Sequence, residues 1–343
     1  MPERLRPVLL VVLFVALYWG GILLADHLIV GPDAVVLLWP PGALAFVLLL
    51  REGRRRWWMI VLAEVVSAFF WIQAPLAFLP FALAANLAGA FAAVTLARRL
   101  GLHRDSPFDL GNLHILPLTG LTLALASLPF GLTGLLLTGM SPPEAAGAAA
   151  LKWLAANTLG VVLLAPCVWL LWPTHDPRPP APPLNPLERL ERGTWSAALL
   201  ASLAAVGLLP YTAVANAAAM AALPGLVLLW GAIRLPARWA AGGCLVSGLI
   251  LAILAATDTG ALREPQNTVD ALILVVLLFT LTLAPLVLMA AVAESRRTAA
   301  EMLRRSRTDP LTGLPNRGGL QHQAGKALEA APADLPMLLL YLD

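Results

Sequence analysis

Ionisable side chains interrupt several long apolar segments of this chain. Glu64 lies near the middle of the apolar segment 57–73, and Lys152 lies about one and a half helical turns inside another such segment. A charge in hydrocarbon is costly, so residues of this kind commonly contact a ligand, a proton or an ion. Glu64 is a candidate for that chemistry, and a protonated carboxyl that only packs and hydrogen-bonds is the alternative. Lys152 is long enough to reach the external face of the membrane instead.

The remaining polar candidates are two asparagines and one helix start. Asn86 and Asn157 are expected to form hydrogen bonds between helices. In the segment 39–42, Trp-Pro-Pro-Gly, the two prolines remove two backbone donors, which can open a helix and shape a small pocket. The complete set of candidate binding residues is Glu64, Trp39, Pro40, Pro41, Gly42, Asn86, Lys152 and Asn157.

The cysteines and histidines indicate no metal or disulfide chemistry. Cys167 and Cys244 both lie in apolar runs, which predicts two buried thiols and no disulfide. No group of His, Cys and carboxylate residues in the apolar part has the spacing of metal ligands, so no metal site is expected there.

The composition indicates whether these groups are surrounded by water or by lipid. Of the 343 residues, 59% are hydrophobic and 13% are charged, against a usual charged share of about 25%. Such a chain cannot hide its apolar surface in one water-soluble core, which excludes a soluble domain, a disordered chain and a disulfide scaffold. The sequence predicts an all-α polytopic membrane protein, because backbone groups in lipid must be paired within each segment.

Ten apolar segments have lengths near the roughly 20 residues that a helix needs to cross a bilayer core of about 30 Å. A count of eight remains open, because Pro210 and Tyr211 leave almost no loop between the seventh and eighth segments. The first segment is expected to be an uncleaved helix, since bulky Tyr18 and Trp19 stand where a signal peptide would have small residues. The ten segments are 7–25, 34–50, 57–73, 76–97, 113–138, 147–172, 195–214, 216–233, 238–257 and 269–293.

The basic residues predict the orientation. When the ten segments are threaded alternately, all of the 23 Lys and Arg residues except Lys152 and Arg263 fall on one side. The positive-inside rule then places both termini in the cytoplasm. The basic charge is thus explained by topology, and no nucleic-acid partner is expected. One loop on that side, 173–186, has seven prolines in fourteen residues and is predicted to be a stiff, extended spacer.

Four stretches resemble the first type of bacterial membrane-associated sensor (MASE) domain. They are LLWPPGALAFVLLLREGRR at 37–55, LANLAGAFAAVTLARRL at 84–100, WLAANTLGVVLLAP at 153–166 and LPGLVLLWGAIRLPARWAA at 223–241. The resemblance covers roughly 7–297, although many members have an acidic residue where this chain has Asn157. It implies a multi-pass sensor of an unknown signal in a bacterial cytoplasmic membrane, connected to a cytoplasmic output domain.

Beyond the last apolar segment the composition becomes polar. Residues 294–308 are mostly good helix formers and should extend the last helix about 20 Å into the cytoplasm. Ala293, Ala300 and Leu303 form a thin apolar stripe, along which two copies could pair as a short coiled coil. The chain is therefore divided into a membrane domain (1–293), a helical stalk (294–308) and a third region (309–343).

The third region begins with Asp-Pro-Leu-Thr-Gly-Leu-Pro-Asn-Arg. Asp309 is predicted to cap a one-turn helix, and Asn316 is predicted to cap a second helix over about 317–330. Residues 335–343 are predicted to form a buried strand that ends on Asp343.

This opening resembles that of the GGDEF family, the diguanylate cyclases, which usually begin with D-x-L-T-G-L-x-N-R. The resemblance implies that Asp343 is a magnesium ligand and that the third region is the start of an α/β cyclase domain. A complete cyclase would join two GTP molecules into cyclic di-GMP with magnesium, each domain of a homodimer bringing one GTP. The matching residues are Asp309, Leu311, Thr312, Gly313, Leu314, Asn316 and Arg317.

The sequence ends before the family's signature hairpin, so the 343-residue chain itself is expected to be inactive. Three other interpretations remain. The output could be a histidine kinase, although His322 lies in QHQAGK, which is not a phosphoacceptor box. The chain could also be a polytopic transporter that uses Glu64, or a noncatalytic partner that dampens intact sensors.

Overall fold

The computed structural model describes residues 5–29, 36–70, 74–104, 106, 110–172, 185–209, 217–309, 311–312 and 314–330. The chain divides into two compact units, Met1–Ala290 and Ala291–Asp343. Within the described residues the regular elements are helices, with two isolated β-bridges, Ile29 to Val36 and Thr308 to Pro315. This confirms the all-α character of the membrane part. The predicted strand over 335–343, and Asp343 with it, lies outside the described residues.

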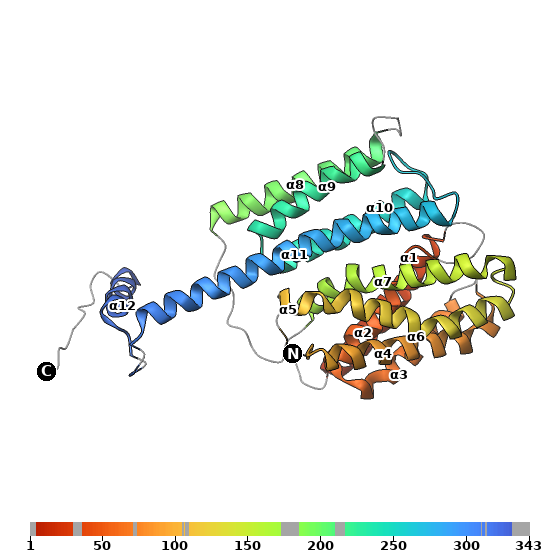
Figure 1. Cartoon of the computed structure of the whole chain (residues 1–343), viewed down its shortest axis with the longest axis horizontal. Helices are drawn as coiled ribbons and strands as arrows, with labels where there is room; N and C mark the ends of the chain where they lie inside the picture. Colours follow the sequence, from red (N-terminus) through yellow and green to blue (C-terminus); the bar gives the residue numbers. More distant parts are fainter. Residues whose placement is uncertain are drawn as a thin grey trace. The chain divides into compact units, whose positions relative to one another are not determined.

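Helices account for most of the first unit, and one of them continues into the second unit (Figure 1). They are α1 (Leu5–Asp26), α2 (Pro40–Glu52), α3 (Trp57–Phe70), α4 (Leu79–Arg99), α5 (Leu110–Leu113), α6 (Ile115–Leu137), α7 (Ala146–Leu171), α8 (Pro186–Leu208), α9 (Ala217–Arg234), α10 (Ala237–Ala256), α11 (Thr268–Arg307) and α12 (Arg317–Ala330).

Each of the ten predicted apolar segments overlaps a helix. Within the part of the chain that the structure describes, six helical segments are long and apolar enough to cross a membrane. The multi-pass membrane character is therefore supported, whereas the count of ten stays a prediction. The six are Pro7–Asp26, Leu76–Arg99, Gly111–Leu137, Pro143–Leu171, Ala237–Ala256 and Thr268–Arg304.

Helix α2 differs most from the prediction. It has 13 residues, about 20 Å of helix, which is shorter than the bilayer core. It begins at Pro40, so the two prolines start the helix rather than interrupt it. Proline is tolerated in the first turn because the N–H it lacks has no partner within the helix there. All residues from Pro40 to Arg51 are buried, which explains a helix that is apolar on every side.

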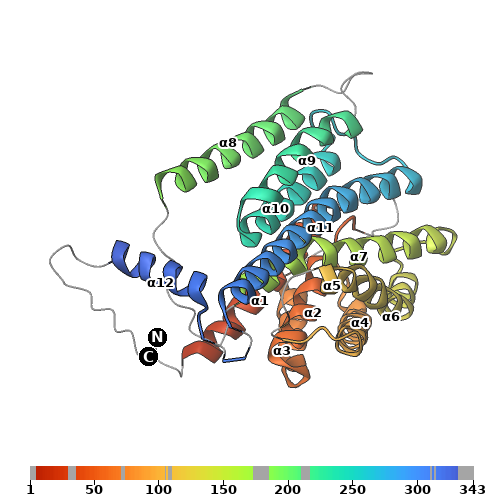
Figure 2. The same ribbon diagram turned by 60° about the vertical axis from the view of Figure 1, so that its left-hand side comes forward.

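The first unit is assembled around α2 and α7. Helix α2 packs against α1, α4 and α7, and α6 packs against both α4 and α7 (Figures 1 and 2). A Cβ atom added to Gly89 of α4 would lie 2.9 Å from the Leu123 carbonyl oxygen of α6. Such close backbone approach is typical of membrane helices, which associate through small residues. Helices α8, α9 and α10 pack together, and α10 also contacts α7.

Candidate functional site

A buried hydrogen bond joins the first and third helices. Tyr18 of α1 donates its hydroxyl to Oε2 of Glu64 on α3 at 2.6 Å. Tyr18 is 0% exposed and Glu64 is 6% exposed. A buried tyrosine hydroxyl and a buried carboxyl each need a polar partner, and here each provides one for the other.

Two more side chains extend this contact. Glu64 also interacts with the side chain of Asn86 on α4. The Oδ1 atom of Asn86 accepts a hydrogen bond of 3.2 Å from Nε1 of Trp39. Because that oxygen is engaged by Trp39, the amide nitrogen of Asn86 is the group that can donate to Glu64. Tyr18, Glu64, Asn86 and Trp39 form what we call the buried polar network, which connects α1, α3, α4 and the residue before α2.

The position of Trp39 is set by α7. Its backbone N–H donates to the carbonyl of Ala156 at 3.2 Å. Its own carbonyl lies so close to α7 that a Cβ atom at Gly160 would be 2.5 Å from the oxygen. A Cβ at Gly42 would lie 3.3 Å from Oδ1 of Asn157. The turn before α2 therefore rests directly on α7, and this contact aims the Trp39 indole at Asn86.

The structure brings together three of the predicted residues, Glu64, Asn86 and Trp39. Asn86 forms a hydrogen bond outside its own helix, as predicted, but its partner is Trp39, the residue before α2. Asn157 differs from the prediction, because its Nδ2 donates to the Trp153 carbonyl one turn earlier in its own helix, α7. Pro40, Pro41 and Gly42 are buried in the first turn of α2.

Lys152 is placed differently from the expectation. It is 5% exposed, so the structure buries it within the bundle rather than extending it to the membrane surface. The reason is the position of α7, which is covered by α2, α6 and α10.

Tyr18 is the member of the network that sequence reasoning missed. In the sequence, the bulk of Tyr18 argues against a signal peptide but gives no sign of the network. The available signal was the phenolic hydroxyl within an apolar segment, which requires a hydrogen-bond partner when it is buried.

A small cavity borders the network at Glu64. Its volume is about 20 Å³, and Glu64 and Ser67 are its polar lining residues, among apolar residues of α1, α3 and the segment that leads into α4. This volume accommodates about one water molecule. Ser67 donates its hydroxyl to the Ala63 carbonyl, so Glu64 is the carboxyl available to the cavity. The geometry suits a proton, a water molecule or a small cation, and excludes a metabolite-sized ligand.

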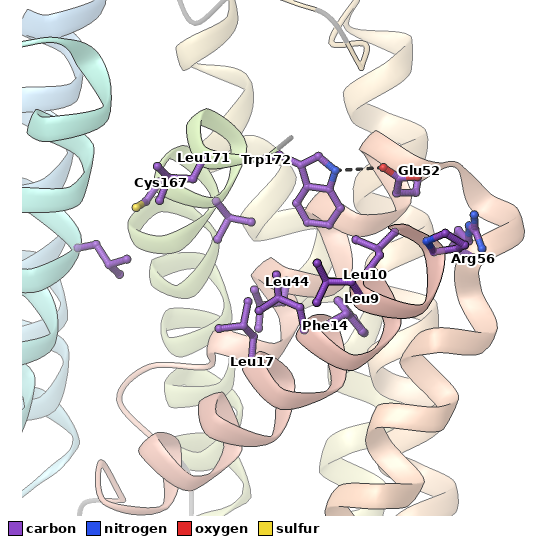
Figure 3. Close-up of a pocket in the computed structure, with 14 residues that line it drawn as sticks. Leu9, Leu10, Phe14, Leu17, Leu44, Glu52, Arg56, Cys167, Leu171 and Trp172 are labelled. Carbon is purple, nitrogen blue, oxygen red and sulfur yellow. Dashed lines mark hydrogen bonds between the residues drawn. The ribbon is translucent and has the colours of Figure 1, made fainter. Parts of the chain in front are cut away.

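A larger cavity of about 500 Å³ lies between α1, α2, α7 and α10. Figure 3 shows leucines of α1 and α7 and Phe14 around it, with Glu52, Arg56 and Trp172 at one end. Trp172 donates from Nε1 to Oε1 of Glu52 at 3.1 Å. The cavity can hold an apolar chain, but none of the predicted binding residues lines it.

The two cysteines are buried, as predicted. Cys167 and Cys244 are both free and buried. Among the residues that the structure describes, no group of three or more His, Cys, Asp or Glu side chains is arranged to hold a metal ion.

The second unit contains the end of α11, a turn and α12. We call residues 306–319 the joint, because they include the last residues of α11, the turn and the first residues of α12. Asp309 Oδ1 accepts hydrogen bonds from the backbone N–H of Leu311 at 3.0 Å and of Thr312 at 2.9 Å. Asn316 Oδ1 accepts from the Gly319 N–H at 3.0 Å, and its Nδ2 donates to the Ser306 carbonyl at 2.8 Å. The capping role predicted for Asn316 is confirmed, and α12 begins at the predicted residue. Asp309 accepts the expected backbone hydrogen bonds, but Leu311 and Thr312 lie in a turn and not in the predicted one-turn helix.

The joint should respond to acid through Asp309. Hydrogen bonds from Thr312 hold the pKa of this carboxyl below its ordinary value of 3.8. At a pH above 3.8, the ordinary pKa, the ionised Asp309 carboxylate stabilises the turn. This stabilisation is lost as the pH falls through the lowered pKa. In a carboxyl carbon NMR titration of the detergent-solubilised chain, Asp309 should titrate below 3.8, and Thr312→Val should raise its midpoint. A midpoint that does not change in Thr312→Val would contradict the assignment.

A family model named MASE1 matches residues 8–297. The chain belongs to the MASE1 family. This family consists of membrane sensor domains. The match covers α1 to α10 and α11 as far as residue 297, so the buried polar network lies inside the MASE1 domain and the joint lies after it. No GGDEF domain model matches the chain. No curated protein and no solved structure matches it either.

Proposed function

We propose that this MASE1 domain controls a diguanylate cyclase, which makes cyclic di-GMP from two GTP in the complete protein. The observation that carries the proposal is the joint. The motif Asp309 to Arg317 stands immediately after α11, and its polar residues form the turn that connects α11 to α12. The residues of the motif therefore shape the turn after α11, as expected where an output domain begins.

Helix α11 provides the mechanical route. It is one helix from Thr268 to Arg307, with Pro285 inside it, so the sequence of the membrane part continues directly into the joint. At the joint, the Asn316 N–H donates to the Arg307 carbonyl at 2.9 Å, and the Asp309 N–H donates to the Leu314 carbonyl at 2.8 Å. These bonds tie the end of α11 to the start of α12 and support transmission of a movement between them.

Two copies would act together. Met302 and Leu303 on the stalk part of α11 are 66% and 48% exposed. Pairing of two stalks along this surface would bury them and bring two cyclase domains, each with one GTP, toward each other. In that assembly Asp343 would be a magnesium ligand, and magnesium would lower the pKa of the attacking hydroxyl and hold the phosphates. Cytoplasmic termini, as the basic residues predict, would place the cyclase where GTP is available.

The buried polar network is the part of the domain that we assign to sensing. It connects α1, α3, α4 and the residue before α2 through a carboxyl that borders a cavity of one-water size. Gain or loss of a proton or small cation at Glu64 would change the hydrogen bonds to Tyr18 and Asn86, and so the packing of α1 against α3 and α4.

The cyclase output is tested with the complete open reading frame that encodes this chain. The purified membrane protein, supplied with GTP and magnesium, should form cyclic di-GMP, measured by mass spectrometry. The chain ending at residue 343 should form none. Absence of product from the complete protein, with GTP and magnesium bound, would overturn the cyclase output and leave the MASE1 assignment intact.

The sensing role is tested in cells with Glu64→Gln. We expect the basal level of cyclic di-GMP to change by roughly fivefold or more, the scale of a typical coupling free energy between sites. Glu144→Gln is the matched control, because Glu144 is exposed in the short 3-10 helix Pro143–Ala145 that precedes α7 and lies outside the network. Equal output from both variants and the parent protein would argue against a sensing role for Glu64.

A further inference from the structure

A third cavity, of about 580 Å³, lies between α8, α10 and the end of α7. We call it the α8–α10 groove. Its lining includes Arg192 and Trp195 of α8, and Arg238, Trp239 and Gly242 of α10. It is separate from the buried polar network and takes no part in the proposed cyclase output.

The floor of the groove is a fixed pair of tryptophans. Trp195 is 3% exposed, and its Nε1 donates to the Val227 carbonyl of α9 at 2.8 Å. The Trp239 ring meets the Trp195 ring edge-on, with ring centroids 6.4 Å apart. A Cβ atom at Gly243 would lie 2.6 Å from the Trp195 ring, so this position has to be small for the ring to fit. The aromatic floor is therefore held by three helices.

Two arginines stand at one end of this floor. The Arg192 guanidinium lies over the Trp239 ring, 5.5 Å from its centroid. Stacking engages the face of the guanidinium and leaves its N–H edge free to donate. Arg238 is exposed beside Trp239. Among the described residues neither arginine has an acidic partner, whereas the nearby Arg234 is paired with Glu191 at 2.6 Å.

The groove becomes apolar away from the arginines. Leu200 lies eight residues after Arg192 in α8, and Val246 lies eight residues after Arg238 in α10. At 1.5 Å per residue, both helices carry the lining about 12 Å deeper than the charges. Leu200 is 61% exposed and Val246 is 44% exposed, so this apolar surface is open rather than covered by protein.

We infer that the α8–α10 groove binds one anionic phospholipid from the leaflet on the arginine side of the membrane. The phosphate would accept hydrogen bonds from Arg192 and Arg238, and an acyl chain would lie along Leu200 and Val246. A charged pair of donors at the mouth and an apolar trough behind it match a molecule with a phosphate head and a hydrocarbon tail. A soluble phosphate compound would leave the trough unfilled. A zwitterionic lipid such as phosphatidylcholine offers the same phosphate, but its quaternary ammonium cancels the negative charge that two arginines favour.

The head-group contact is tested by native mass spectrometry of the full chain released from detergent with added lipid. The parent protein should retain phosphatidylglycerol over phosphatidylcholine of the same acyl chains. Arg192→Gln and Arg238→Gln should each weaken phosphatidylglycerol retention by roughly tenfold, the scale of one hydrogen bond to a charged group. Arg234→Gln is the control, because Arg234 is on the same side of the membrane part but outside the groove. Equal retention of both lipids, or an equal loss in Arg234→Gln, would overturn the inference.

The trough is tested with Gly242→Leu. An added Cβ at Gly242 meets nothing within 4 Å, so the variant should fold while its side chain fills the groove. Gly147→Leu on α7 is the matched control, since its added Cβ also meets nothing and it lies outside the groove. Phosphatidylglycerol retention should fall in Gly242→Leu alone, and glycerophosphoglycerol, the head group without chains, should not compete. Unchanged retention in folded Gly242→Leu, or competition by the head group alone, would overturn the inference.

Discussion

Gly160→Ala is expected to lower the free energy of unfolding of the membrane unit by about 1–3 kcal/mol, the usual cost of overfilling a packed interior. The new Cβ atom would lie 2.5 Å from the Trp39 carbonyl oxygen, which belongs to the backbone and cannot rotate away. Relief requires Trp39 to move, which breaks its N–H bond to Ala156 and shifts its indole from Asn86.

Thermal unfolding in detergent, followed by circular dichroism, measures this effect. Gly147→Ala is the control on the same helix, because its Cβ meets nothing within 4 Å. Its melting temperature should equal or slightly exceed that of the parent, since alanine favours helix over glycine. A melting temperature for Gly160→Ala that matches Gly147→Ala would contradict the close approach of α2 and α7.

Tyr18→Phe is expected to destabilise the same unit by about 1–3 kcal/mol, because Glu64 Oε2 loses a donor while it stays buried. Glu64→Leu alone leaves the Tyr18 hydroxyl without its acceptor. The double variant Tyr18→Phe/Glu64→Leu removes both groups, so its destabilisation should be smaller than the sum of the single effects. The difference should be about 0.5–3 kcal/mol, as for residues in direct contact.

Unfolding of the four proteins of this cycle, in one detergent, gives the coupling. Thr122→Val serves as the control for hydroxyl removal, because Thr122 is partly exposed and donates its hydroxyl to the Leu118 carbonyl of its own helix. It should change stability little. Additive effects of the Tyr18 and Glu64 substitutions would show that the two side chains do not depend on each other.

Several features of the site could be predicted residue by residue but not as an arrangement. Glu64 and Asn86 stand out because a polar group in an apolar segment needs a partner. Which partner it finds depends on packing, since Glu64 meets a hydroxyl 46 residues earlier and Asn86 meets an indole 47 residues earlier. Hydropathy and spacing describe one segment at a time and carry no information on such pairs.

Arg51 shows the same limit. By sequence it is one of several arginines in a basic loop. In the structure it is 8% exposed, its guanidinium stacks over the Trp169 ring at 4.2 Å, and its Nη2 donates to the Trp169 carbonyl at 2.8 Å. The side chain thus connects α2 to α7, a role that charge counting could not distinguish from solvation.

The sequence by itself determined that this protein is helical and lies in a membrane, because these properties follow from how many apolar residues stand together. It also determined the caps of the joint, since Asp309 and Asn316 bond to atoms within ten residues of themselves. Only the tertiary structure decided that α2 is a short buried helix, that Lys152 is buried, and that Tyr18, Glu64, Asn86 and Trp39 meet. The physical reason is that these outcomes depend on which helices pack together, and helices that are similarly apolar differ too little in composition to specify their neighbours.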